Sequence, residues 1–172
     1  MKLITNNLNI KPLNLFELED LIGGLQTSGE LDYAVLPSRY RNQLFADCLM
    51  KDIRSNIHKH PQDYLYYTIW LLINKENRNV AGHLFFSGSP DACGEVELYS
   101  EIFDEEQEHE YLKESINAIL TWAANVKRIK LIRTNVPVND SFMSRIMKDS
   151  GFEKIAGFHH FENWIWKNEK NQ

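Results

Sequence analysis

The segment from Gln107 to Glu114 holds side chains that could take part in chemistry, because it lies where a strand pattern gives way to a helix pattern. It reads Gln-Glu-His-Glu-Tyr-Leu-Lys-Glu and follows three further acids, Asp104, Glu105 and Glu106. The first turn of a helix has unpaired backbone N–H groups and the positive end of the helix dipole, so it binds anions. The anion is either a phosphate of a ligand or the protein's own carboxylates, each of which stabilises the dipole by about 0.3–1 kcal/mol. The sequence leaves both alternatives open.

A strand and a helix must position this segment. Residues 94–100 alternate, with Val96 and Leu98 on one face and Glu95, Glu97 and Tyr99 on the other, which predicts a strand. A helix is predicted over residues 108–125, because apolar residues recur there at helical spacing. These are Leu112, Ile116, Ile119, Leu120 and Ala123.

The remaining elements predict one domain over residues 1–172, of the α+β class, with a mixed, mostly antiparallel sheet flanked by helices. Asn14 and Glu17 form a capping-box pattern at the start of a helix that Gly23-Gly24 ends, and Pro61 ends a second helix. The predicted order is β-α-α-β-β-β-α-β-α-β-β. Besides the strand and helix above, it comprises a strand over 2–12, a helix over 38–60, a hairpin of 64–73 and 80–86, a strand over 128–134, a short helix over 140–149, and strands over 152–156 and 161–166.

Motifs in this order resemble the GNAT family of N-acetyltransferases, in particular its ribosomal-protein branch, and the resemblance covers most of the chain. The family's acetyl-CoA segment reads roughly V-E-I-G-Y-x-I-x-P-E-x-Q-G-x-G-Y-x-x-E-A. Without a gap it meets Val96, Glu97, Leu98, Ile102, Asp104, Glu105, Gln107, Tyr111 and Glu114. Val80–Leu84 is similar to the family's V-I-G-x-I strand, Pro90-Asp91 and Gly94–Glu97 to the approach to the cofactor strand, and Ile146–Phe152 to the end of its short helix.

The resemblance implies the GNAT fold and transfer of an acetyl group from acetyl-CoA to a primary amine. The acceptor would be a small molecule or a peptide, such as a protein N-terminus, and a homodimer is compatible with it. The resemblance also implies the residues that hold acetyl-CoA. They are Ile102, Gln107, Glu108, His109, Glu110, Tyr111, Leu112 and Asn139.

The chain departs from the family at the phosphate loop, where two glycines of the pattern fall on Glu108 and Glu110. A carboxylate ~5 Å from a phosphate, at an effective dielectric of ~20, costs at most roughly 3 kcal/mol. We therefore expect weak acetyl-CoA binding, which replacing both glutamates by glycine would tighten. The alternative is a non-catalytic GNAT-like module that has lost acetyl-CoA and binds a protein or a small ligand in the same cleft.

Two further positions differ from the family. The tyrosine that many GNAT enzymes use to protonate the departing thiolate falls on Met147, which cannot donate a proton. The family's asparagine before the short helix resembles Asn139, whereas counting back from Gly151 gives Asp140.

Glu97 falls on the glutamate of the family's V-E-I-G-Y strand, so the resemblance implies that it is the base for the attacking amine. His83 on the neighbouring strand is a second candidate. The alternatives are an ordinary solvent-facing strand glutamate and a packed or hydrogen-bonded histidine.

Bulk properties favour a cytoplasmic protein without a nucleic-acid or membrane partner. The net charge of the 172 residues is −5, and the unbroken apolar run from Ile69 to Ile73 is too short to span a bilayer. Residues 1–12 lack the apolar core of a signal peptide, and Cys48 and Cys93 have no companion ligands, which predicts reduced thiols and no metal site.

Overall fold

An eight-stranded sheet forms the centre of the computed structural model, which describes residues 1–23, 47–103 and 108–171. The spatial order of the strands is β1-β2-β3-β4-β5-β6-β8-β7, and all neighbours are antiparallel except β5 and β6. The strands are β1 (Leu3–Ile4), β2 (Leu8–Pro12), β3 (Ile69–Asn74), β4 (Val80–Phe86), β5 (Glu95–Ile102), β6 (Leu131–Pro137), β7 (Glu153–Phe158) and β8 (Phe161–Lys167).

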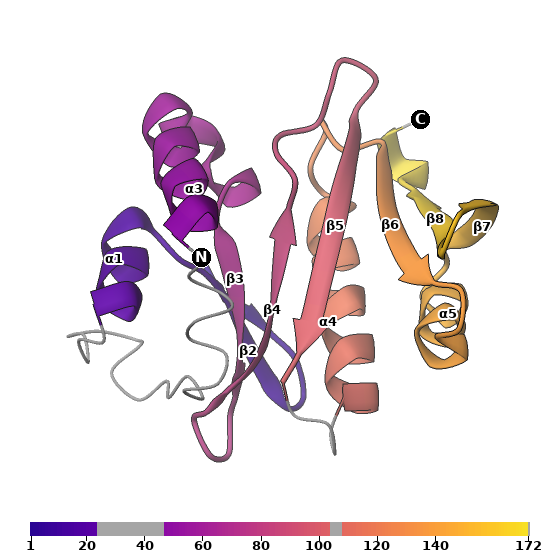
Figure 1. Ribbon diagram of the computed structural model, residues 1–172, viewed down its shortest axis with the longest axis horizontal. Helices are drawn as coiled ribbons and strands as arrows, with labels where there is room; N and C mark the ends of the chain where they lie inside the picture. Colours follow the sequence, from indigo (N-terminus) through magenta and orange to yellow (C-terminus); the bar gives the residue numbers. More distant parts are fainter. Residues whose placement is uncertain (24–46, 104–107, 172) are drawn as a thin grey trace.

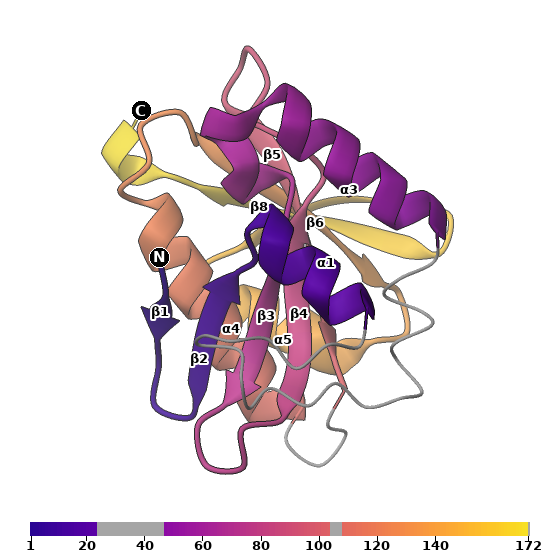
Figure 2. The same cartoon turned by 90° about the vertical axis from the view of Figure 1, so that its left-hand side faces the viewer.

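Helices cover both faces of this sheet (Figures 1 and 2). α1 (Leu15–Gly23) and α3 (Asp47–Lys59) lie on one face, while α4 (Glu108–Ala123) and α5 (Ser141–Asp149) lie on the other. Two short 3-10 helices, η1 (Pro61–Tyr66) and η2 (Glu169–Asn171), complete the described elements. None of the helices in the described ranges is long and apolar enough to cross a membrane.

Each face of the sheet has its own hydrophobic core, which explains why β3 is apolar throughout. Ile69, Leu71 and Ile73 pack against α1 and α3, whereas Trp70 and Leu72 pack against α4. Because successive side chains of a strand point to opposite faces, a strand with helices on both sides buries every residue. All six residues of β3 are buried.

The predicted fold class and element order are confirmed, and the largest differences lie in three of the predicted strands. The predicted strand over 2–12 is broken by a turn, in which the backbone N–H of Thr5 donates to the carbonyl of Leu8 at 3.0 Å. The predicted hairpin strand over 64–73 begins only at Ile69, because Pro61 starts η1 and proline suits the first turn of a helix. β6 begins three residues later than predicted, since the Ile129 N–H bonds back to Val126 in a turn. The part of the predicted helix over 38–60 that precedes Asp47 lies outside the described residues.

β5 and β6 lie side by side only at their start. They pair at Glu95–Leu131, Val96–Ile132 and Glu97–Arg133. Beyond these pairs β5 continues to Ile102 against β4, while β6 continues to Pro137 against β8 (Figure 1). The two strands therefore diverge, and α4 begins at the open end of the gap between them.

Gly82 permits the close pairing that keeps β5 on the β4 side of this gap. A Cβ at this position would lie 2.3 Å from the carbonyl oxygen of Glu101. We expect Gly82→Ala to lower the free energy of unfolding by roughly 2–3 kcal/mol, because an extra methyl group must displace backbone. Urea denaturation measures the change, and Ser100→Ala on the adjoining strand serves as a control that should cost under about 1 kcal/mol. Equal effects of the two variants would contradict this account.

Candidate functional site

A turn before β5 and the turn before β6 bring the two strands together. One carboxylate oxygen of Asp91 accepts hydrogen bonds from the backbone N–H groups of Cys93 and Glu95, at 2.8 and 2.9 Å. The carbonyl of Gly94 accepts the N–H of Lys130 at 2.9 Å, and Gly94 itself has a φ of +83° that disfavours other residues. These contacts fix the start of the parallel pair, so the position at which the strands part is also fixed.

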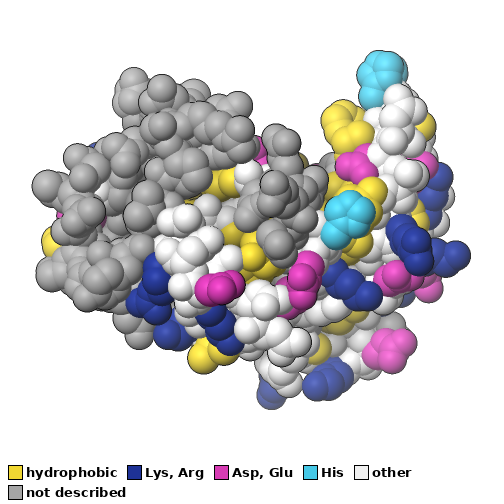
Figure 3. Space-filling view, turned by 90° about the horizontal axis from the view of Figure 1, so that it is seen from below, with side chains coloured by type: hydrophobic (Ala, Val, Ile, Leu, Met, Phe, Trp, Pro, Cys, Tyr) yellow, Lys and Arg dark blue, Asp and Glu magenta, His cyan; other side chains and the backbone are white. Residues whose placement is uncertain are grey.

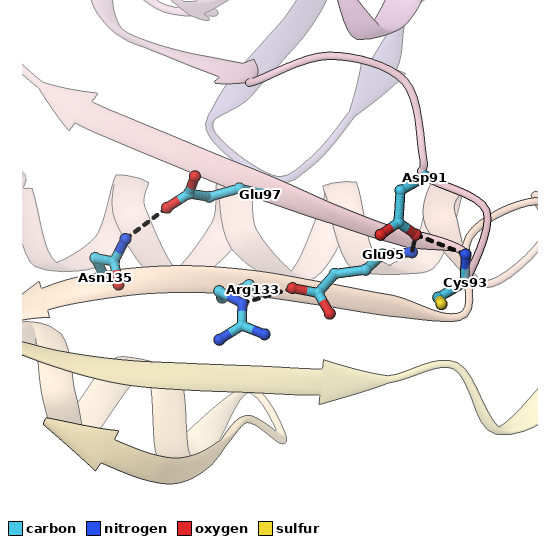
Figure 4. Close-up of polar contacts among 6 residues, drawn as sticks. All are labelled: Asp91, Cys93, Glu95, Glu97, Arg133 and Asn135. Carbon is cyan, nitrogen blue, oxygen red and sulfur yellow. Dashed lines mark hydrogen bonds and ion pairs between the residues drawn. The ribbon is translucent and has the colours of Figure 1, made fainter.

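Glu97 lies where the strands part, and its side chain reaches toward β6. Its Oε1 atom accepts a hydrogen bond from Nδ2 of Asn135 at 2.5 Å (Figure 4). Two residues earlier on β5, Glu95 forms an ion pair with Arg133 of β6 at 2.6 Å. Sequence reasoning missed Asn135, because the predicted strand ended at Thr134.

Tyr99 contacts the same carboxylate from along β5. Its hydroxyl is hydrogen-bonded to Glu97, and its ring stacks on Phe85 of β4 with centroids 4.9 Å apart. Burial, followed by the hydrogen bond and the charge of Glu97, raises the pKa of Tyr99 to about 12. Tyr99 and Asn135 therefore hold the half-buried Glu97 side chain in one orientation.

His83, the second candidate base, lies away from this point. It is 5% exposed, lies between the rings of Phe85 and Phe103, and is opposite Glu101 in the pairing of β4 with β5. Burial lowers the pKa of His83 to about 4, so the imidazole is neutral near pH 7. Glu101 is four residues from Glu97, which corresponds to roughly 13 Å along a strand. The two candidate bases therefore cannot serve the same reacting nitrogen, and Glu97 is the one at the gap.

Most described side chains of the predicted cofactor residues on α4 do not face the gap between β5 and β6. Tyr111 and Leu112 are buried in the core, where the hydroxyl of Tyr111 accepts a hydrogen bond from Nδ2 of Asn74 at 2.5 Å. The ring of His109 stacks on Phe142 of α5, with centroids 3.4 Å apart. Among its described groups, α4 therefore presents to the gap the backbone N–H groups of its first turn.

Glu110 and Glu114 bind the β1–β2 turn. Glu110 accepts a hydrogen bond from Nδ2 of Asn7 at 2.8 Å. Glu114 accepts from Oγ1 of Thr5 at 2.5 Å, and from the backbone N–H and Nδ2 of Asn7 at 3.1 and 2.7 Å. Glu110 therefore has a long-range partner, and Asn7 directs one of its carboxylate oxygens toward the β1–β2 turn. The acids Asp104, Glu105 and Glu106, together with Gln107 and the side chain of Glu108, lie outside the described part.

The last two predicted cofactor residues lie at the ends of the diverging strands. Ile102 ends β5, and its side chain packs partly buried against the larger core. Asn139 is exposed in the turn that follows β6. Asp140 instead caps α5, accepting the N–H of Met143 at 2.8 Å. Asp140 thus has a structural role, whereas the side chain of Asn139 is exposed to solvent.

Charges of both signs alternate over the described part of the end at which the gap opens (Figure 3). No group of three or more His, Cys, Asp or Glu side chains in the described ranges could hold a metal ion. A pocket of 250 Å³ lies between α3 and β4, where Asp52, Asn56, Tyr67 and Phe85 are among its lining residues. It reaches Ser87, whose N–H donates a hydrogen bond to the carbonyl of Glu97 at 3.0 Å.

Comparison with solved structures identifies the architecture. No family model and no curated protein sequence matches the chain. RimL, a ribosomal L7/L12 α-N-protein acetyltransferase in complex with coenzyme A, superposes with a TM-score of 0.67 at 14% identity, covering 99% of both chains. Ribosomal-protein-S5-alanine acetyltransferase from Vibrio fischeri gives 0.66 at 10% identity, covering 100% of this chain and 99% of that one. Spermidine N-acetyltransferase from Vibrio cholerae gives 0.62 at 14% identity, covering 96% of each. The chain has the GNAT fold over its whole length, which confirms the predicted architecture.

The buried imidazole of His83 predicts a loss of stability in acid. Its pKa is near 4 in the folded protein and 6.5 in an unfolded chain. Between these values the unfolded chain binds the proton and the folded one does not, so the free energy of unfolding falls as pH drops from 6.5 toward 4, by about 3 kcal/mol in total. His83→Phe should remove this part of the pH dependence. Urea denaturation of both proteins at about pH 7 and about pH 4.5 measures the difference, and parallel losses would disprove it.

Proposed function

We propose that the protein is a GNAT-family N-acetyltransferase of the ribosomal-protein branch, which transfers an acetyl group from acetyl-CoA to a primary amine. The observation that carries the proposal is the gap between β5 and β6, with Glu97 where the strands part and the first turn of α4 at the open end. Acetyl transfer needs a proton acceptor for the amine and an anion site for the phosphates of acetyl-CoA. In this proposal Glu97 is the proton acceptor at one end of the gap, and the first turn of α4 is the anion site at the other end. Its location would be the cytoplasm.

The facing edges of the two strands suit the pantetheine arm of acetyl-CoA. Residues 98–102 of β5 and 134–137 of β6 are not paired with each other, so backbone groups on these edges can bond the amides of an extended arm. Glu97 and Ile102 are five residues apart, roughly 17 Å along the strand. This span would place the thioester near Glu97 when the phosphates lie at the first turn of α4, with Asn139 on the opposite side of the opening.

Glu97 has the position and chemistry of a general base. Acetyl-CoA supplies an acetyl group activated as a thioester. A primary amine is mostly protonated near pH 7 and must lose its proton before it attacks a carbonyl carbon. Glu97 would accept that proton directly or through one water, while Asn135 and Tyr99 hold its carboxylate in place. Met147 is fully buried in the core, so it takes no part in protonating the departing thiolate.

The amine acceptor is a small molecule or a peptide N-terminus. The structures with this fold include proteins described as acting on a ribosomal protein and on spermidine. One of them is dodecameric, and a homodimer of the present chain is compatible with the proposal. The pocket that borders Ser87 gives an acceptor room on the α3 side of the gap.

The rival function is a GNAT-like module that no longer binds acetyl-CoA. The glutamates at the glycine positions of the phosphate loop favour it, because carboxylates weaken an anion site. Calorimetry with acetyl-CoA and with CoA separates the two functions. If neither acetyl-CoA nor CoA binds and no thiol is released, the rival function is supported.

The role of Glu97 is tested by Glu97→Gln, which keeps the size of the side chain and an oxygen acceptor for Asn135. We expect kcat to fall roughly 10²- to 10⁴-fold, with little change in the Kd for acetyl-CoA, because only proton transfer is lost. Glu95→Gln is the matched control, since Glu95 lies on the same face of β5 and is engaged by Arg133. A thiol-release assay measures kcat, and similar losses in the two variants would remove Glu97 from the mechanism.

The phosphate loop is tested by replacing its glutamates one at a time. Glu108→Gly should tighten acetyl-CoA binding, by at most roughly a hundredfold at low salt, and the gain should shrink as salt rises. Glu110→Gly should tighten it much less, because Asn7 already holds that carboxylate toward the β1–β2 turn. It should also cost about 1 kcal/mol of stability, since glycine disfavours a helix. Calorimetry over a salt series measures both, and equal gains would show that Asn7 does not direct Glu110.

A further inference from the structure

Tyr99 contacts Glu97 through a group that can itself exchange a proton. Its hydroxyl is hydrogen-bonded to the Glu97 carboxylate, and both side chains leave β5 on the same face because they are two residues apart on the strand. The other partner of Glu97, Asn135, is an amide that donates a hydrogen bond but keeps its protons. A carboxylate and a phenol in direct contact, by contrast, form a pair between which a proton can pass.

The ring of Tyr99 is held in place while part of the side chain stays accessible. The ring lies nearly parallel to Phe85, with 9° between the two planes, and Tyr99 as a whole is 37% exposed. The pairing of β5 with β6 ends at Glu97, so Tyr99 is the first residue on this face beyond the point where the strands part. It therefore lies beside the unpaired edges to which the proposed function assigns the thioester.

The sulfur that leaves acetyl-CoA gains a proton, and the groups already described do not supply it. A free thiol has a pKa of about 8.5, so the product carries the proton at neutral pH. Met147 has no proton to donate and is fully buried. The hydroxyl of Tyr111 is buried in the core, where Asn74 engages it. Tyr99, in contrast, contacts the base itself.

We propose that Tyr99 is the acid that protonates the departing thiolate, and that Glu97 then restores the proton of Tyr99. The inference rests on the proposed function and adds a catalytic residue to it. The lone pair of the amine nitrogen forms the C–N bond, and the C–S bond breaks with its electron pair on sulfur.

The protons of this step balance. The ammonium group of the acceptor loses two protons in all, the first to Glu97 before attack and the second to solvent as the amide forms. Tyr99 gives its own proton to sulfur and takes the proton that Glu97 holds. The products are an amide and a free thiol, and both side chains return to their starting states.

The contact between the two side chains also sets the order of these events. Burial, the hydrogen bond to Glu97 and the charge of Glu97 all raise the pKa of Tyr99. The last two act only while Glu97 is ionised, so the phenol keeps its proton until the amine arrives. Once Glu97 has taken the proton of the amine, Tyr99 becomes a stronger acid. The pair therefore releases a proton toward sulfur only after the nucleophile has formed.

The inference is tested with Tyr99→Phe, which keeps the ring on Phe85, and with two acetyl donors, acetyl-CoA and its selenoester analogue. The donors differ only in the leaving atom, and a selenolate is a much weaker base than a thiolate, so it departs without a proton. We expect kcat to fall roughly 10²-fold with acetyl-CoA and less than about threefold with the selenoester, measured as acetylated amine by mass spectrometry. Tyr64→Phe, which removes a hydroxyl from η1, is the control and should alter neither rate.

The comparison of the two donors separates an acid from a residue that only orients Glu97. Equal losses of kcat with both donors would overturn the inference, because the task of Glu97 is the same in both reactions. An unchanged kcat with acetyl-CoA would overturn it as well. In both cases acetyl transfer by the unmodified protein would leave the proposed function standing. Absence of acetyl transfer from either donor by the unmodified protein would refute the proposed function and the inference together.

Discussion

The hydrogen bonding of the β5 and β6 backbones is the constraint on which the rest of the structure depends. The strands share three residue pairs and then follow different partners, β4 on one side and β8 on the other. Buried backbone groups need partners, so strands that separate inside a sheet must either meet solvent or bind something that supplies those partners. The Asp91 turn, the Gly94 contacts and the Gly82 approach all fix where the separation begins. The backbone of Glu97 acquires its position from that point, and Asn135 orients its side chain.

The overall architecture was predictable because its signals are local and repeated. Periodicity placed α4, the β3–β4 hairpin and β5, and the Gly151 stop placed the end of α5. The errors lie where a distant residue decides the local structure. The turn between β1 and β2 also binds Glu114, which is more than a hundred positions away in sequence. Residues 2–12 contain the turn-forming Asn6 and Asn7 but do not reveal this distant partner.

The candidate site was predictable at Glu97 and less so around it. The resemblance indicated Glu97, but its partner Asn135 lies past the predicted end of β6, and the choice between Glu97 and His83 needed the strand register. The effect of the phosphate-loop glutamates on acetyl-CoA binding was harder still to predict from the sequence, because it depends on the direction in which each carboxylate points. Asn7 holds one oxygen of the Glu110 carboxylate toward the β1–β2 turn, which the residue type alone does not predict.

The hydrogen bonds of Thr5 and Asn7 to Glu114 also bear on the order in which the chain folds. They join positions 109 and 107 residues apart in the sequence, and so close one of the longest loops in the protein. Contacts of large sequence separation form late, because the entropy of closing the loop is lost before the contact is gained. During synthesis the β1–β2 turn must wait until α4 has been made. β1 and β2 are thus among the last strands to reach all of their final hydrogen bonds, and until then their free edge is exposed to other chains.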